Sequence, residues 1–193
     1  YVPSFRASFG RFLNRDTKAF VTYGTGYKLP SLYQLYSNYG DQNLKQENST
    51  ALEATVEHHL TADSVISITT FENRFSDMID YDNITNRYFN ISKSSSRGFE
   101  IQSLFKLANE LKLSTSYIYL KTKDEGTGLD LLRRAQHIWK LSLQYRKESY
   151  NLYFENSYHG EREDIDPNDF QRLKMSSYSV ASVGASFDLK SGF

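Results

Sequence analysis

The stretch Lys18–Ser49, KAFVTYGTGYKLPSLYQLYSNYGDQNLKQENS, joins a strand pattern to a long loop that leads toward a second strand. Residues 18–27 alternate in side-chain character with a period of two, which is the period of a β-strand. Gly, Pro and Asn punctuate the aromatic middle of the stretch, which predicts an irregular connection. We therefore expect two long strands separated by a long, tyrosine-rich loop.

The same alternation recurs along the whole chain. It is cleanest in residues 138–146, whose two faces carry Trp139, Leu141, Leu143 and Tyr145 on one side and Lys140, Ser142, Gln144 and Arg146 on the other. It is repeated in the ranges 51–60 and 177–189, and more faintly in 4–13, 18–27, 64–75, 98–106, 111–121 and 150–159. The pattern predicts an all-β fold of about nine strands.

Strand length and loop length favour a membrane barrel over a soluble fold. The predicted strands run about 10 to 14 residues, whereas strands of soluble proteins most often have about 5 to 6. Tight turns are expected at residues 61–63, 108–110 and 147–149, and long connections at 28–48, 76–92, 122–132 and 161–174. Short turns on one side and long loops on the other are typical of outer-membrane barrels. A soluble β-rich binding module is the alternative from another class.

Composition excludes several other classes of function. The chain has 193 residues, with 23 basic and 23 acidic side chains, so no net charge attracts nucleic acid. It has no cysteine, which rules out disulfides and thiolate sites. No apolar run is long enough for a membrane-spanning helix, but barrel strands show only every second residue to lipid. The 15 tyrosines and 13 phenylalanines suit an apolar–polar boundary.

The run YGTGYKLPSLYQLYS followed by DQNLKQENS, within residues 23–49, resembles the TonB-dependent receptors at a strand entering an extracellular loop. Three later runs match the pattern of the cobalamin receptors of that family in the same order: SDMIDYDN (76–83), RYFNISKSSSRGFE (87–100) and LLRRAQHIWKLSLQY (131–145). Gln42 and Gln46 replace prolines common there. The resemblance implies that residues 1–193 are a partial C-terminal β-barrel domain, an antiparallel transmembrane fragment of a 22-stranded barrel.

The resemblance also implies a function and partners. Such receptors actively take up a large scarce nutrient through the outer membrane of Gram-negative bacteria. The expected ligand is cobalamin or a related corrinoid, and a ferric siderophore is the alternative. The expected partners are the lipid bilayer, the plug domain and the TonB complex, and the plug is expected to lie outside this sequence. Inward polar residues such as Glu100 and Gln102 would then bond to the plug.

No catalytic or metal site is predicted. Ser157 and His159 share one strand face, but a Ser–His pair at this spacing arises easily by chance, so we expect no enzyme. Two acidic loop clusters could supply oxygen ligands to calcium, namely Asp77, Asp80, Asp82 and Asn83, and Glu161, Glu163, Asp164, Asp166 and Asp169. Neither has an ordered ligand spacing, so we expect neither metal nor cofactor.

Two sets of residues are the candidates for ligand contact. Tyr33, Tyr36 and Tyr39 lie in the predicted loop, where tyrosines either contact a large ligand or pack the loop against its neighbours. Arg133 and Arg134 are adjacent at a predicted loop-to-strand junction, so one is expected to face the lumen and the other outward. The alternative for both arginines is a role in rim salt bridges or at the polar surface of the lipid layer.

Overall fold

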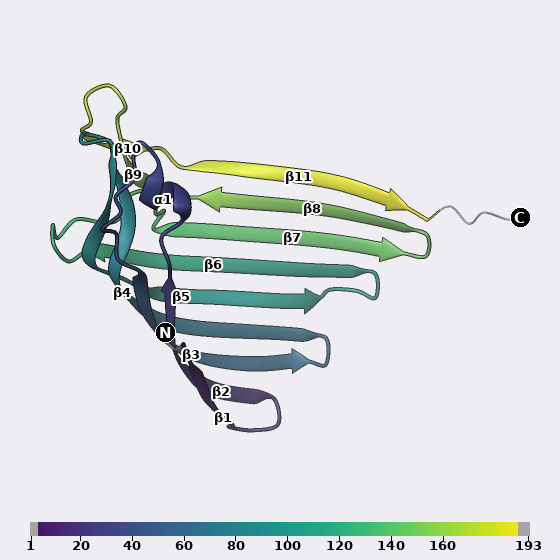
Figure 1. Ribbon diagram of the computed structural model, residues 1–193. Coiled ribbons are helices and arrows are strands. Elements are labelled where there is room, and N and C mark those ends of the chain that lie inside the picture. The colour runs from purple at the N-terminus through teal and green to yellow at the C-terminus, as the bar shows by residue number, and fades with distance from the viewer. Residues whose placement is uncertain (1–3, 189–193) are drawn as a thin grey trace, which may run out of the picture.

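The protein is described from a computed structural model, in which residues 4–188 are placed (Figure 1). Within that range it has eleven strands and one short helix. They are β1 (Arg6–Phe12), β2 (Thr17–Lys28), α1 (Leu32–Tyr36), β3 (Glu47–Thr61), β4 (Ser64–Asp82), β5 (Arg87–Lys106), β6 (Leu111–Asp124), β7 (His137–Lys147), β8 (Tyr150–His159), β9 (Arg162–Ile165), β10 (Arg172–Met175) and β11 (Tyr178–Phe187).

Nine of the strands form one curved antiparallel sheet. Its order is β1-β2-β3-β4-β5-β6-β7-β8-β11, and β9 pairs with β10 in a separate hairpin. Each neighbour in the large sheet is antiparallel, and the short turns all lie at one end of it (Figure 1). The predicted all-β antiparallel fold and the asymmetry of its connections are confirmed.

The predicted loop at residues 76–92 is wrong in its extent. β4 and β5 continue through it as a paired hairpin, and only residues 83–86 form the turn. The Asp82 carboxylate holds this turn, because it accepts hydrogen bonds from the Ile84 amide at 2.8 Å and the Thr85 hydroxyl at 2.7 Å. The Asp and Asn residues of this stretch predict a loop because they favour turns, but cross-strand pairing prevails here.

The other long connections contain structure as well. The connection after β2 includes α1, and the connection after β8 includes the β9–β10 hairpin. β6 extends to Asp124 and so takes up the start of the predicted loop at 122–132. The end of the predicted last strand, Leu189, lies outside the described residues.

One face of the sheet carries an apolar band. Cross-strand register places Val56, Ile68, Ile101, Tyr117 and Trp139 in a single row across five strands. Since partners in register share a face, the whole row projects to the same side. Trp139 is 53% exposed, and no second sheet covers this face within residues 4–188. The band is therefore not the inner face of a sandwich.

Aromatic side chains border the band at both ends. Toward the loops, Tyr117 lies 4.3 Å from Trp139 between ring centroids. Toward the turns, Tyr145 and Tyr150 have ring centroids 6.0 Å apart, and Phe187 follows on the next strand. From Trp139 to Tyr145 the chain advances six residues, about 20 Å along the strand. Strands of membrane barrels tilt by about 35–45°, so this stretch accounts for about 15 Å of height, which fits within an apolar band about 25 Å tall.

The opposite face is polar. Thr55 and Thr69 share a hydrogen bond at 2.9 Å across β3 and β4. The Glu100 carboxylate accepts from the Gln102 amide at 2.8 Å and from the Ser116 hydroxyl at 3.0 Å. Side chains of this face line a hollow of about 620 Å³. No helix among residues 4–188 is long and apolar enough to cross a membrane.

Candidate ligand-binding surface in the outer loops

Four connections meet at the loop-bearing end of the sheet. They are the α1 connection, the end of the β4–β5 hairpin, the connection between β6 and β7, and the connection that contains β9 and β10 (Figure 1). Loops on a rigid scaffold are the usual location of binding residues. We call these four segments the outer loops and take them as the candidate site.

The α1 turn begins with a capping box. The Ser31 hydroxyl accepts a hydrogen bond from the Gln34 amide at 3.2 Å, and the Gln34 side chain accepts one from the Ser31 amide at 2.9 Å. These two bonds satisfy backbone donors that the first turn of a helix otherwise leaves free. The turn presents Tyr33 and Tyr36, whose side chains are both exposed.

Tyrosines join the α1 connection to the β4–β5 hairpin. Tyr33 meets Tyr88 edge to face at 6.2 Å between ring centroids, and Tyr39 meets Tyr81 in the same way at 6.1 Å. Tyr81 and Tyr88 are 5.1 Å apart. We call Tyr33, Tyr39, Tyr81 and Tyr88 the tyrosine cluster. Of the three tyrosines predicted for ligand contact, Tyr33 and Tyr39 therefore also pack one loop on another, while Tyr36 is 66% exposed.

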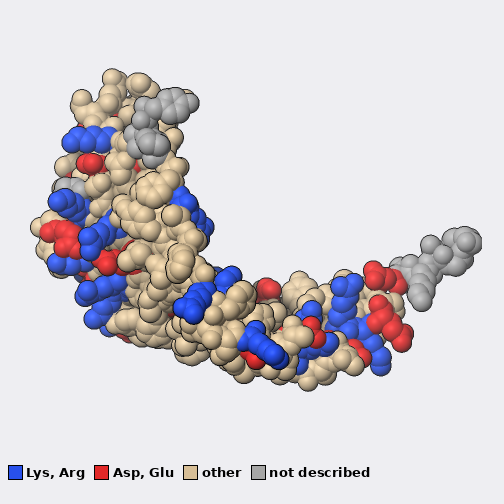
Figure 2. All heavy atoms as spheres, turned by 90° about the horizontal axis from the view of Figure 1, so that it is seen from below, with Lys and Arg blue, Asp and Glu red and all other residues tan. Residues whose placement is uncertain are grey.

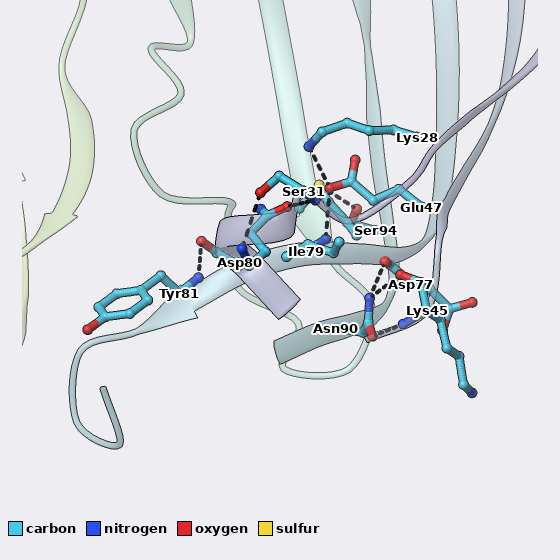
Figure 3. Close-up of polar contacts among 12 residues, drawn as sticks. Lys28, Ser31, Lys45, Glu47, Asp77, Ile79, Asp80, Tyr81, Asn90 and Ser94 are labelled. Atoms are coloured by element: carbon cyan, nitrogen blue, oxygen red, sulfur yellow. Dashed lines mark hydrogen bonds and ion pairs between the residues drawn. The ribbon is translucent and has the colours of Figure 1, made fainter. Parts of the chain in front are cut away.

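A polar bridge reinforces this packing (Figure 3). The Asn90 side chain accepts a hydrogen bond from the Lys45 amide at 2.9 Å and donates to the carbonyls of Lys45 at 3.2 Å and Asp77 at 2.6 Å. The Glu47 carboxylate accepts from Lys28 Nζ at 2.9 Å and from the Ile79 amide at 3.1 Å. Asn90 connects the α1 connection to the hairpin, and Glu47 connects the end of β2 to the hairpin at the base of that connection, so the two segments form one platform.

We expect Asn90→Ala to loosen this platform without unfolding the sheet. The change removes three hydrogen bonds and leaves two carbonyls and one amide without their side-chain partner, at a local cost of about 1–3 kcal/mol. Hydrogen exchange should show a faster rate at the Lys45 amide and unchanged protection in β7. Unchanged exchange at Lys45 would contradict the bridge. Asn38→Ala, at an exposed turn position of the α1 connection, is the matched control.

Arg133 and Arg134 precede β7, so the strand alternation on which their predicted split of faces depends does not apply to them. Arg133 has a positive φ of 60°. Its amide donates to the Glu163 carbonyl at 2.7 Å and its Nε to Asp164 Oδ1 at 2.9 Å. Arg134 is exposed and makes one long bond, at 3.5 Å, to the Arg133 carbonyl. Arg133 thus forms the rim salt bridge, and Arg134 extends into solvent.

The Arg133–Asp164 contact should depend on pH. The Ile165 amide and then the Arg133 guanidinium lower the pKa of the Asp164 carboxyl below its ordinary value. A depressed carboxyl pKa stabilises the contact above the unfolded-state pKa, near 4, and this stability is lost as the pH falls through the folded-state pKa. The protection factor of the Arg133 amide, which corrects for the intrinsic pH dependence of hydrogen exchange, should therefore fall from pH 6 to pH 3. In Asp164→Asn this fall should disappear, and its persistence would refute the assignment.

A small cavity lies between the hairpin and the other outer loops. It has a volume of about 240 Å³ and is lined by aromatic and apolar side chains, four aspartates and one arginine; Tyr81, Phe89, Leu131, Phe170 and Arg172 are among them. Sequence reasoning did not single out these residues. Their aromatic character was the available signal, but periodicity cannot show which loops meet.

The described residues form neither a catalytic triad around Ser157 and His159 nor a cluster of metal ligands. The Ser157 hydroxyl is 3.0 Å from His159 Nε2, but the His159 ring stacks on Tyr178 at 4.9 Å. In the described part of the chain, no carboxylate bonds to His159, so the third member of a triad is missing there. Nor do any three His, Asp or Glu side chains among those residues converge as metal ligands would.

Comparison with known proteins agrees with this architecture. A family model described as "TonB dependent receptor-like, beta-barrel" matches residues 1–193. Among solved structures, a mutant of the ferric enterobactin receptor PfeA of Pseudomonas aeruginosa is similar over 97% of this chain, with 20% identity and a TM-score of 0.76. The siderophore receptor PirA of Acinetobacter baumannii (17% identity, TM-score 0.75) and the copper transporter OprC (15%, 0.75) also match over 97% of this chain.

The chain spans only about a third of each of these structures, 33%, 35% and 31% of their lengths. At these identities the structural likeness establishes the fold alone. The family match covers every residue of the sequence. It agrees with the apolar band on one face of the sheet, with the long strands, and with the placement of the long loops at one end of the sheet. The chain therefore belongs to the TonB-dependent receptor family, as part of its β-barrel.

Proposed function

We propose that this chain forms part of the wall and outer loops of a Gram-negative outer-membrane receptor that actively takes up cobalamin or a related corrinoid. The observation that carries the proposal is the platform in which the α1 connection and the β4–β5 hairpin are joined by the tyrosine cluster and by Asn90. A rigid aromatic surface suits a large ligand because it costs little side-chain entropy on binding.

The family supplies the transport mechanism in this proposal. The polar face of the sheet, with Glu100 and Gln102, would meet a plug domain, and the TonB complex would act on that plug. The apolar band would meet the bilayer. The segment itself supplies wall and loops, and it carries out no chemistry on the ligand.

The charge of the outer loops favours a corrinoid over an anionic chelate. Residues 29–46, 77–92, 125–136 and 160–177 together contain eleven carboxylates and seven cationic side chains, a net charge of −4. A surface of this sign repels a multiply charged anion within about a Debye length, roughly 8 Å at physiological salt. Cyanocobalamin has no net charge and would meet no such repulsion.

A ferric siderophore is the second candidate, and the structural neighbours favour it. Several of them are named as siderophore receptors, including the ferric enterobactin receptor and PirA. Cationic groups that could meet an anionic chelate are present at Arg134 and Arg172. The two ligands differ in charge, so the salt dependence of binding would separate them.

The proposed contact residues are Tyr33, Tyr36, Tyr39, Arg133 and Arg134. Tyr36 and Arg134 are the best placed to touch the ligand directly, since both are exposed and neither packs another loop. Tyr33, Tyr39 and Arg133 would shape the surface while also holding the loops together.

The test is equilibrium binding of cyanocobalamin and of a set of ferric siderophores to the receptor chain that contains these strands, in detergent. We expect cobalamin binding that Arg134→Ala weakens by about tenfold, the loss of one charge-assisted hydrogen bond. Lys147→Ala, at the turn end, should leave the affinity unchanged. Siderophore binding without cobalamin binding would overturn the corrinoid assignment and retain the receptor class.

A further inference from the structure

Five cationic side chains project from the outward face just beyond the apolar band, and two of them, Arg74 and Lys123, are in ion pairs. On β5 and β6, Phe99 pairs in register with Tyr119, and two residues nearer the loops Arg97 pairs with Lys121. Lys93 lies two further steps along the same face of β5, paired with Ser76. Each step of two residues advances about 7 Å along a strand. We call Lys93, Arg97 and Lys121 the outer cationic row.

The row is on the face of the sheet that carries the apolar band, and not on the opposite, polar face. Side chains alternate strictly along a strand, and the pairing of β5 with β6 continues without a shift from Ser94 to Lys106. Arg97 therefore projects with Phe99 and Ile101, and Lys121 projects with Tyr119 and Tyr117. Glu100 and Gln102, by contrast, project to the polar face. A ligand in the lumen would not contact this row.

The neighbouring carboxylates are already paired, but the row is not. Glu72, which stands opposite Arg97 on β4, binds Arg74 at 2.8 Å, and Glu125 binds Lys123 at 3.0 Å. Within residues 4–188, no carboxylate lies within 4.0 Å of the charged atoms of Lys93, Arg97 or Lys121. Like charges directly opposite each other on paired strands are destabilising, and this is the arrangement of Arg97 and Lys121. An anion bound between them would relieve that repulsion.

The surface around the row is hollowed. A hollow of about 850 Å³ is lined by all three members of the row and by hydroxyl side chains that include Ser76, Ser95 and Thr122. Its lining also contains the cations of Arg74 and Lys123 and the carboxylates of Glu72, Glu125 and Asp130. This volume exceeds the need of a single phosphate ion and falls within the range of sites for drug-sized groups. Charged side chains of both signs lie at this loop-bearing end of the molecule, and others lie toward the turn end (Figure 2).

We propose that the outer cationic row binds the phosphate groups of a phosphorylated glycolipid in the outer leaflet, whose acyl chains lie along the apolar band below it. The position fits such an amphiphile because cationic groups stand above an aromatic border and an aliphatic surface, in the order headgroup, interface and chains. Arginine and lysine are the side chains that bind phosphate, arginine with a planar fork. The inference depends on the proposed membrane placement of the sheet and not on the identity of the nutrient.

The test uses the receptor chain that contains these strands, purified in an uncharged detergent. The probe is a bis-phosphorylated, multiply acylated glycolipid, and its dephosphorylated form serves as the comparison. Binding of the phosphorylated probe should weaken on the order of a hundredfold in the triple variant Lys93→Gln, Arg97→Gln, Lys121→Gln. The double variant Arg11→Gln, Lys147→Gln changes cations of the same face at the turn end and should alter binding less than about twofold.

Further measurements distinguish binding of the glycolipid from binding of a free phosphate ion. They also show whether the triple variant acts only by lowering the positive charge of the protein. Arg97→Lys keeps the charge and should retain most of the binding, and affinity for the wild-type chain should fall as salt rises. Cobalamin binding should be the same in the triple variant and the wild type, so failure of the nutrient proposal would be seen separately. Equal binding of the dephosphorylated probe, equal loss in both multiple variants, or full displacement by millimolar inorganic phosphate would each overturn the proposal.

Discussion

Replacing Leu143 with arginine is expected to destabilise the receptor in a bilayer by about 2–4 kcal/mol, the cost of an arginine on the lipid face near the membrane midplane. Leu143 pairs with Leu113 on one side and Phe154 on the other, and it lies between the two aromatic borders of the band. An arginine there would have to displace lipid contacts or draw water into the apolar layer.

The matched control is the neighbouring residue. Ser142→Arg introduces the same side chain one position earlier, where it projects into the polar hollow beside Lys140 and Glu155. Its cost should stay below about 1 kcal/mol, as expected for a lumen substitution. Urea titration of the folded receptor in lipid vesicles measures both values. Equal costs for the two arginines would mean that the band does not meet lipid, which would revive the soluble β-rich module.

A single methyl group at Gly98 should have an effect of similar size. A Cβ at this position would overlap the Tyr119 carbonyl oxygen of the paired strand and approach Phe71 Cζ to 3.1 Å. The obstacle is backbone, so β5 and β6 would have to separate at this point of the ladder. Glycine inside a strand often marks such a close approach.

We expect Gly98→Ala to cost about 3 kcal/mol or more and to reduce the yield of assembled barrel. Gly24→Ala is the control, because a Cβ there meets its nearest atom, the Phe5 carbonyl oxygen, at an ordinary 3.6 Å. Assembled and unassembled forms can be separated by their mobility in detergent gels with and without heating. Comparable assembly of both variants would show that the strands can accommodate the added carbon.

Periodicity was sufficient for the parts of the fold that have two chemically different faces. Residues 138–146 show why, because apolar side chains alternate there with Lys140, Ser142 and Gln144, and a shift of one residue would exchange the faces. β7 occupies His137–Lys147, within one residue of the prediction at each end. The tight turn at residues 147–149 was recognised for the same reason, as the point where alternation pauses.

Periodicity failed beyond the band, where each face of the strands mixes apolar and acidic side chains, as Met78 and Asp80 do on one face of β4 and Asp77 and Ile79 on the other. β4 continues to Asp82, and β5 begins at Arg87. The strands reach this far although the outer part of β4 contains Asp77 and Asp80, and Asp favours turns. Pairing along the ladder outweighs local propensity there. Periodicity could not predict the platform either, because Asn90 binds Lys45 across 45 residues of sequence.

The candidate site was predicted in part. The sequence pointed to Tyr33, Tyr39 and Arg133 as loop residues of interest, and their contacts with Tyr88, Tyr81 and Asp164 became visible only in the folded chain. Their role in ligand contact stays a prediction.

By itself, the sequence determined the antiparallel sheet, its two faces and the side on which the long loops lie, because a period of two and turn residues act locally along the chain. Only the tertiary structure decided which loops touch, and which like charges stand opposite each other. The loop contacts join segments far apart in the sequence, as when Asn90 binds Lys45, and no local pattern shows which segments meet. The pairing of Arg97 with Lys121 depends on the register that the turn between β5 and β6 sets, and residue alternation alone does not fix that register to the residue. The outer cationic row follows from that register.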